Sequence, residues 1–260
     1  MNLNAISRGE GPVLVLLHGL FGQAGNFGAV QRRLAQPREG QPGRRVIALD
    51  LRNHGGSPHG MGMDYRILAE DVHQTLAGLG VLPCGVLGHS MGGKTAMALA
   101  LHHPGAVIRL CVADIAPVRY PPHLASYAAA MRALPLSQGL TRAEADAALA
   151  PVVTDATERA FLLSNLRLGA DPHWRVGLDE IIAGMDDIQD WPDNAAPPNA
   201  GPSLFLTGAR SRYVQPENRS AITALFPSAS FVSLRNAGHW LHADDPEGFV
   251  SVVEAFFPAH

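Results

Sequence analysis

Val86-Leu87-Gly88-His89-Ser90-Met91-Gly92-Gly93 holds a Gly-x-Ser-x-Gly pattern, preceded by apolar residues and followed by a helix-forming run. A serine between a strand end and a helix start lies on a sharp, strained turn that exposes its hydroxyl as a nucleophile. Glycine is expected at positions 88 and 92, because a Cβ two residues from the serine would collide across that turn. The pattern therefore predicts Ser90 as a nucleophile and the Met91 amide, at the helix N-terminus, as an oxyanion donor.

Strand-length apolar runs recur along the chain and alternate with helical patterns. The runs are Val13 to Leu17, Val46 to Leu49, Val86-Leu87, Ile108 to Ala113, Ser203 to Leu206 and Phe231 to Leu234. The clearest helix lies between Asp64, expected as its N-cap, and Gly80, expected as its stop. This alternation predicts an α/β fold with a mostly parallel sheet covered by helices on both faces. Leu3 to Ser7 is placed to add an antiparallel edge strand.

The alternation stops between Pro117 and Pro202. Helical patterns remain at His123 to Leu134, Thr141 to Leu149, Thr157 to Leu166 and Leu178 to Met185, but no strand is expected, and a Pro-rich linker, Trp191 to Pro202, ends the stretch. Ligands bind beyond the carboxyl ends of parallel strands, so we expect residues 117–202 to form a helical cap, or lid, over a core of residues 1–116 and 203–260. A separately folding helical domain is the alternative.

Composition excludes several classes of function. The net charge of −3 in 260 residues offers no footprint for nucleic acid, and no apolar run reaches the roughly 20 residues of a membrane span. The N-terminus lacks the features of a secretory signal, and Cys84 and Cys111 are expected to be buried and reduced, so we expect a cytoplasmic protein. The histidines show no metal-ligand spacing, so no metal is expected. Nothing indicates the oligomeric state.

Two further loops complete a reactive constellation. His18-Gly19-Leu20-Phe21-Gly22 follows the first long strand and predicts Leu20 as the second oxyanion donor, with Phe21 as competitor; His18 is expected to brace this loop. Asn236-Ala237-Gly238-His239-Trp240 follows the last strand, which places His239 to reach the serine. The order Ser, acid, His is that of the hydrolases with a nucleophile elbow.

Together these motifs resemble the α/β-hydrolases. More narrowly, Arg52-Asn53-His54-Gly55-Gly56-Ser57-Pro58, Gly88-His89-Ser90-Met91-Gly92-Gly93-Lys94 and Asp114-Ile115-Ala116-Pro117 resemble the YbfF-type serine esterases and their abhydrolase relatives. The resemblance covers essentially the whole chain and is weakest in the cap. It implies an α/β-hydrolase fold and cofactor-free cleavage of acyl esters, or of acyl-CoA thioesters in some members.

The acid of the triad departs from the usual pattern. In the superfamily it commonly follows the second-last strand in a Gly-x-x-Asp turn, but here that turn reads Gly208-Ala209-Arg210-Ser211. The resemblance places the acid instead at Asp114, at the end of the strand beside the nucleophile strand; a turn or N-cap aspartate is the alternative reading. Two acids late in the cap, Asp186 and Asp187, are weaker candidates.

The sequence identifies the substrate pocket and the charged residues near the site less closely than the triad. Phe21, Trp174 and Trp240 are candidates for an acyl pocket, with Trp191 and Tyr120 as further aromatics. Lys94 lies four residues after Ser90, so a helix-packing or surface role is expected rather than Ser-x-x-Lys chemistry. An Asp–Arg pair within Asp50, Arg52 and Asn53 is expected to stabilise the loop under the site.

The leading hypothesis is a serine carboxylesterase acting on a small-molecule ester or thioester through an acyl-enzyme. The same triad would serve a C–C bond hydrolase or a cofactor-free haloperoxidase-like enzyme. A ligand sensor on a hydrolase scaffold is the alternative from another class.

Overall fold

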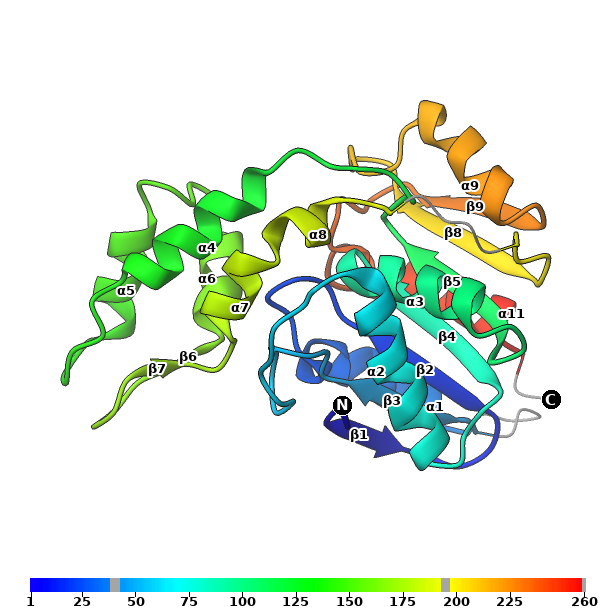
Figure 1. Ribbon diagram of the computed structural model, residues 1–260, viewed down its shortest axis with the longest axis horizontal. Helices are drawn as coiled ribbons and strands as arrows, with labels where there is room; N and C mark the ends of the chain where they lie inside the picture. The colour runs from blue at the N-terminus through cyan, green and yellow to red at the C-terminus, as the bar shows by residue number, and fades with distance from the viewer. Residues whose placement is uncertain (38–42, 193–196, 259–260) are drawn as a thin grey trace.

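A computed structural model describes residues 1–37, 43–192 and 197–258 (Figure 1). Its centre is a seven-stranded sheet of order β1-β3-β2-β4-β5-β8-β9. The strands are β1 Ala5–Arg8, β2 Val13–Leu17, β3 Arg45–Leu49, β4 Cys84–His89, β5 Val107–Ala113, β8 Ser203–Gly208 and β9 Ala229–Leu234. All neighbours pair in parallel except β1, which runs antiparallel to β3 at one edge. The predicted α/β architecture and its edge strand are confirmed.

Helices cover both faces, because both faces of the inner strands are apolar. Along β2, Leu14 and Leu16 join one core cluster while Val15 and Leu17 join the other. The first cluster is completed by α1 (Gly28–Ala35) and α11 (Pro246–Phe256), and the second by α2 (Tyr65–Gly78) and α3 (Met91–His102). The remaining core elements are η1 Ala24–Phe27, η2 Pro216–Asn218, α9 Arg219–Leu225 and α10 Leu241–Asp244. Burying both faces in this way is what a parallel sheet requires.

The helix α2 has the ends that its sequence predicts. The Asp64 side chain accepts hydrogen bonds from the amides of Arg66 and Ile67, and Gly80 follows with a φ of +66°. Cys84 and Cys111 are buried and free, as expected. Within the described ranges, no helix combines the length and apolarity needed to cross a bilayer.

Residues between β5 and β8 form a separate group of helices beyond one end of the sheet (Figure 1). They are α4 His123–Ala133, α5 Arg142–Leu149, α6 Ala156–Leu163, α7 Leu178–Ala183 and α8 Met185–Gln189. A small antiparallel ladder, β6 Leu166–Arg167 with β7 His173–Trp174, was not expected from the sequence. Two-residue strands are too short to show a period of two, which explains the difference.

Two predicted boundaries in this group also differ. The helix expected to reach Leu166 ends at Leu163, and the one expected over Leu178 to Met185 is divided at Gly184. A Cβ at Gly184 would lie 2.5 Å from the Cβ of Met63, so the division brings the chain close to the core. Part of the predicted Pro-rich linker, residues 193–196, lies outside the described residues.

Candidate active site

Ser90 lies on the turn between β4 and α3 with φ 52° and ψ −120°, a conformation that residues with side chains rarely adopt. The turn is crowded as the sequence predicts. A Cβ on Gly88 would lie 2.1 Å from the carbonyl oxygen of Gly92, and a Cβ on Gly92 would lie 2.4 Å from that of Leu17. Close packing of the backbone thus holds the Ser90 hydroxyl out from the sheet end.

Asp114 and His239 lie together at the same end of the sheet. His239 Nδ1 is 2.7 Å from Asp114 Oδ2, and Asp114 is fully buried. The carboxylate also accepts a hydrogen bond from the Gly208 amide, 3.1 Å from Oδ1, and another on Oδ2 from the Ser211 hydroxyl. Asp114 therefore contacts the turn in which the superfamily usually carries its acid.

The other predicted acids lie elsewhere. Asp186 and Asp187 are both exposed, with 92% of the Asp186 side chain accessible to solvent. Asp186 faces Arg119 at 3.9 Å. The structure brings only Asp114, among the three candidates, to His239.

Two residues that the sequence analysis did not single out hold the His239 loop. His89 Nε2 donates to the carbonyl oxygen of His239 at 2.8 Å, so the residue before Ser90 is tied to the histidine loop. The ring of Tyr213 stacks on the His239 ring with centroids 3.8 Å apart. His89 stands inside the Gly-x-Ser-x-Gly pattern, so its position was a usable signal, whereas nothing local marks Tyr213.

The loop after β2 is held by two neutral histidines. His18 Nδ1 donates to the carbonyl oxygen of Gly19 at 2.8 Å, and its Nε2 accepts from the Leu51 amide at 2.9 Å, which is the expected bracing arrangement. His54 Nε2 accepts from the Phe21 amide at 3.0 Å. Because that bond occupies the Phe21 amide, Leu20 is the better placed of the two expected donors.

An Asp–Arg pair does lie under the site, but its partners are not the expected ones. Arg52 Nε donates to Asp71 Oδ2 at 2.6 Å, across to α2. Asp50 instead accepts from the amides of Ala24 and Gly56 at 2.6 and 2.8 Å. The prediction of a pair within residues 50–53 is therefore wrong, because Arg52 reaches a carboxylate on α2 and two backbone amides occupy Asp50.

An apolar cavity adjoins Ser90 and His239, and its space is about 610 Å³ when the solvent at its mouth is included. Phe21 and Trp240, two of the three pocket candidates, line it. Trp174 does not: its indole donates to the Met131 carbonyl oxygen at 3.0 Å, within the helical insertion. The two further aromatics do not line it either: Trp191 packs on Tyr65, and the Tyr120 hydroxyl donates to the Tyr213 carbonyl oxygen. The insertion contributes other residues that sequence reasoning missed, namely Leu124, Tyr127, Glu158, Phe161 and Leu162.

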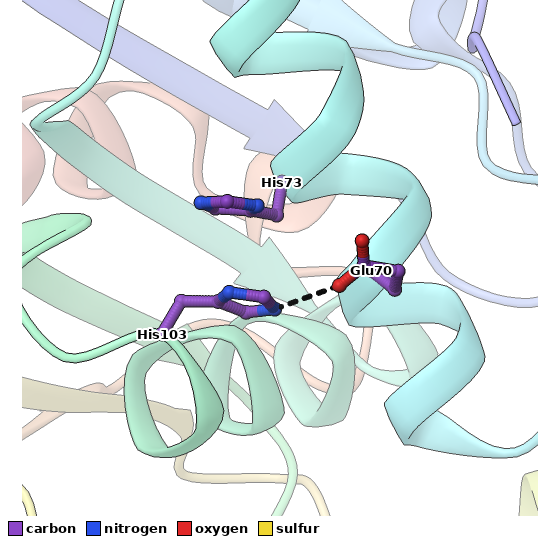
Figure 2. Close-up of side chains that lie close together, drawn as sticks. All are labelled: Glu70, His73 and His103. Atoms are coloured by element: carbon purple, nitrogen blue, oxygen red, sulfur yellow. Dashed lines mark ion pairs between the residues drawn. The ribbon is translucent and has the colours of Figure 1, made fainter.

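Away from this site, three residues of types that can bind a metal lie close together between α2 and α3 (Figure 2). Glu70, His73 and His103 approach so that one ligand atom of each lies within 4.8 Å of the others, with Glu70 Oε2 3.2 Å from His103 Nε2. The two rings are stacked 3.9 Å apart and nearly parallel. Imidazole nitrogens bind metals in the ring plane, so stacked rings cannot share an ion without turning. The Glu-x-x-His spacing was a signal that the sequence analysis overlooked, and the absence of a metal stays a prediction.

The chain is similar to known hydrolases along nearly its whole length. A family model described as the alpha/beta hydrolase fold matches residues 12–246. The chain is 42% identical to the mouse protein named sn-1-specific diacylglycerol lipase ABHD11, over 94% of this chain and 80% of the relative, and 32% identical to the Escherichia coli (strain K12) esterase YbfF, over 94% and 92%. A solved structure titled marine microorganism esterase superposes with a TM-score of 0.92 at 33% identity, covering 99% of this chain and all of the other. The resemblance stated from the motifs is confirmed, and the chain belongs to the α/β-hydrolase family.

Proposed function

We propose that this protein is a serine carboxylesterase that works through an acyl-enzyme intermediate. The observation that carries the proposal is the 2.7 Å contact between Asp114 and His239 beside the cavity that Ser90 and His239 share. A histidine held by a buried carboxylate at Nδ1 presents Nε2 as a base. Relatives named as an esterase and a lipase support ester hydrolysis by this chain.

In the proposed reaction, Ser90 attacks the ester carbonyl while His239 Nε2 takes the hydroxyl proton. The Leu20 and Met91 amides hold the oxyanion of the tetrahedral intermediate. His239 then gives the proton to the leaving alcohol, and the acyl group remains on Ser90. Water attacks the acyl-enzyme with His239 again as base, which releases the acid and restores the serine. A thioester carbonyl would follow the same steps with a thiol leaving group.

Residues 117–202 are proposed to act as a lid over this site. Support comes from Leu124, Phe161 and Leu162, which belong to the insertion and line the same cavity as Ser90. Phe161 also packs edge-on against Trp240, with ring centroids 4.3 Å apart, so the insertion meets the His239 loop directly. A lid of apolar side chains excludes water from the cavity and suits an uncharged chain of the substrate.

The test is hydrolysis of a neutral 4-nitrophenyl ester by the wild type and by Ser90→Ala. Removing a triad nucleophile should lower turnover by roughly 10⁴-fold or more with folding unchanged. Ser137→Ala, at an exposed turn, serves as the matched control and should keep full activity. A fluorophosphonate should label wild type and control but not Ser90→Ala. Full activity in a clean Ser90→Ala preparation would overturn the proposal.

A further inference from the structure

A second and smaller cavity also reaches Ser90. Its space is about 370 Å³ when the solvent at its mouth is included, and it shares Leu20, Ser90, Leu124 and Tyr213 with the first cavity. His239 and Trp240 line only the first cavity, whereas Met91 and Lys94 of α3 line only the second. Because His239 must give its proton to the leaving alcohol, the first cavity takes the alcohol side of an ester. The second, beside the Met91 amide, is then left for the acyl group.

A buried lysine lines the second cavity. Lys94 is only 1% exposed, and its ammonium donates to the carbonyl oxygens of Gln189 and Asp190 at 3.1 and 2.7 Å. Among the described residues no carboxylate lies within 4.0 Å of Lys94 Nζ, and the Asp190 side chain instead pairs with Arg119 at 3.3 Å. The expected surface role for Lys94 is thus excluded. Burial, the largest cause, lowers the pKa of Lys94 to about 7.

An unsatisfied amide lies at the same place. Gln189 lines the cavity and is 5% exposed, and neither its carboxamide oxygen nor its nitrogen has a hydrogen-bond partner within the part of the chain that the structure describes. Buried polar groups of this kind destabilise a fold unless something pairs with them. The Lys94 ammonium also lies 5.3 and 4.9 Å from the ring centroids of Tyr65 and Tyr120. Among the described residues, a lysine without a carboxylate in direct contact and an amide without a partner line one cavity, and together they favour a negatively charged, oxygen-bearing ligand group.

Resting on the proposed function, we infer that the second cavity binds a short acyl group ending in a carboxylate, held by Lys94 and Gln189. The length follows from the place of the two residues in the cavity. Ser90, Lys94 and Gln189 line the same small cavity, so only a short carbon chain can separate the acyl carbon on Ser90 from the distal carboxylate. A half-ester of a four-carbon dicarboxylic acid fits this separation. Lys94 is here a binding residue for the acyl group and takes no part in proton transfer.

Monoethyl succinate and ethyl 4-methylpentanoate test this directly, since a carboxylate in the first replaces an isopropyl group of the same shape in the second. Ethanol release gives kcat/KM for each ester, and their ratio does not depend on the fraction of active enzyme. The wild type should prefer the charged ester. Lys94→Met should lower the ratio about tenfold or more, as expected for one charge-assisted hydrogen bond, mainly through KM.

Lys94 could bind the ligand or only hold the backbone of residues 188–190 in place, and two further variants distinguish these roles. Tyr65→Phe removes the 2.5 Å hydrogen bond from Tyr65 to the Ile188 carbonyl oxygen. It keeps the ring that lines the cavity beside Lys94 and leaves the charge of Lys94, so the ratio should stay at the wild-type value. Gln189→Met should lower the ratio several-fold while the melting temperature stays equal or rises, because it removes an unpaired buried amide. Lys94 acting only as a clamp would predict an unchanged ratio in Lys94→Met and would overturn the inference.

Binding to the Ser90→Ala variant separates this inference from the proposed function. Calorimetric titration with monoethyl succinate should show binding that Lys94→Met abolishes in the same background. Hydrolysis of the neutral ester alone, with no charge preference and no such binding, would refute the acyl site and leave the esterase standing. Binding without hydrolysis of either ester by the wild type would support the site and refute the esterase.

Discussion

Asp114→Asn removes one negative charge from the proposed triad and keeps the shape of the side chain. The amide of Gly208 donates to Asp114 Oδ1, so the asparagine oxygen is held on that side. The new NH₂ group then faces His239 Nδ1 and the Ser211 hydroxyl, where Oδ2 accepted both hydrogen bonds. A donor there favours the histidine tautomer with the proton on Nε2, which cannot act as a base toward Ser90.

The size of the effect follows from these contacts. The productive tautomer requires the asparagine to turn over, which sets its NH₂ against the Gly208 amide and leaves buried donors facing each other. Turnover should fall by up to about 10⁴-fold, as in the serine proteases, or about 5.5 kcal/mol. Ser211→Ala removes one hydrogen bond to the carboxylate, worth about 1.5–3 kcal/mol, so its loss should stay at or below roughly 100-fold.

Steady-state kinetics on a neutral ester, with melting temperatures to confirm folding, measure both variants. Asp187→Asn is the matched control, because this exposed aspartate loses the same charge away from the site, and its kcat should stay near the wild-type value. Asp114→Asn within tenfold of the wild type, in a folded protein, would refute the assignment of the acid. Collapse in Asp187→Asn would place the acid in the insertion instead.

The remaining predictions concern acid stability and the first cavity. Burial lowers the pKa of His54 to about 3, so below pH 6.5 the unfolded chain binds a proton at His54 and the folded chain does not. The free energy of unfolding should therefore be about 2 kcal/mol smaller at pH 5 than at pH 7 on account of His54. Denaturant unfolding at both pH values, compared with His54→Gln, measures this, and equal pH dependence of the two proteins would contradict it. Phe161→Ala should lower kcat/KM for apolar esters about tenfold, because it removes an aromatic wall of the cavity. Trp174→Phe removes the hydrogen bond to Met131 away from the cavity, so it should lower the melting temperature but keep kcat/KM within about twofold. An equal loss of kcat/KM in Phe161→Ala and Trp174→Phe would contradict the cavity as the binding site.

Local patterns could be predicted from the sequence and long-range pairing could not. The turn at Ser90 requires glycine two residues before and after it, so a short stretch of sequence specifies its geometry. By contrast, Arg52 pairs with Asp71 across to α2, which nothing near Arg52 indicates. Trp174 is similar, since its aromatic character made it a pocket candidate, but packing against Met131 decides where it lies.

The same distinction applies to Lys94. Its distance of four residues from Ser90 correctly separates it from Ser-x-x-Lys chemistry, but the spacing does not reveal whether the side chain is buried. That depends on the chain at residues 188–190, which returns from the insertion nearly a hundred positions later and supplies the carbonyl oxygens around the ammonium. Burial of a charge is a property of the assembled fold, and hydrophobic periodicity along one helix carries no information about it.

The place of Asp114 shows how sheet register can relocate a functional group. Ala113 is in register with Leu206 on β8, and the Asp114 amide donates to the Leu206 carbonyl oxygen at 2.9 Å. The end of β5 therefore meets the turn that begins at Gly208. Asp114 also adopts a φ of 54°, which directs the chain away from the strand at this point. A carboxylate at the end of either strand can then reach the same histidine, and a serine at position 211 can donate to it. Moving the acid from the turn after β8 to the end of β5 is therefore a small change in space, although Asp114 and Ser211 are 97 residues apart in the chain.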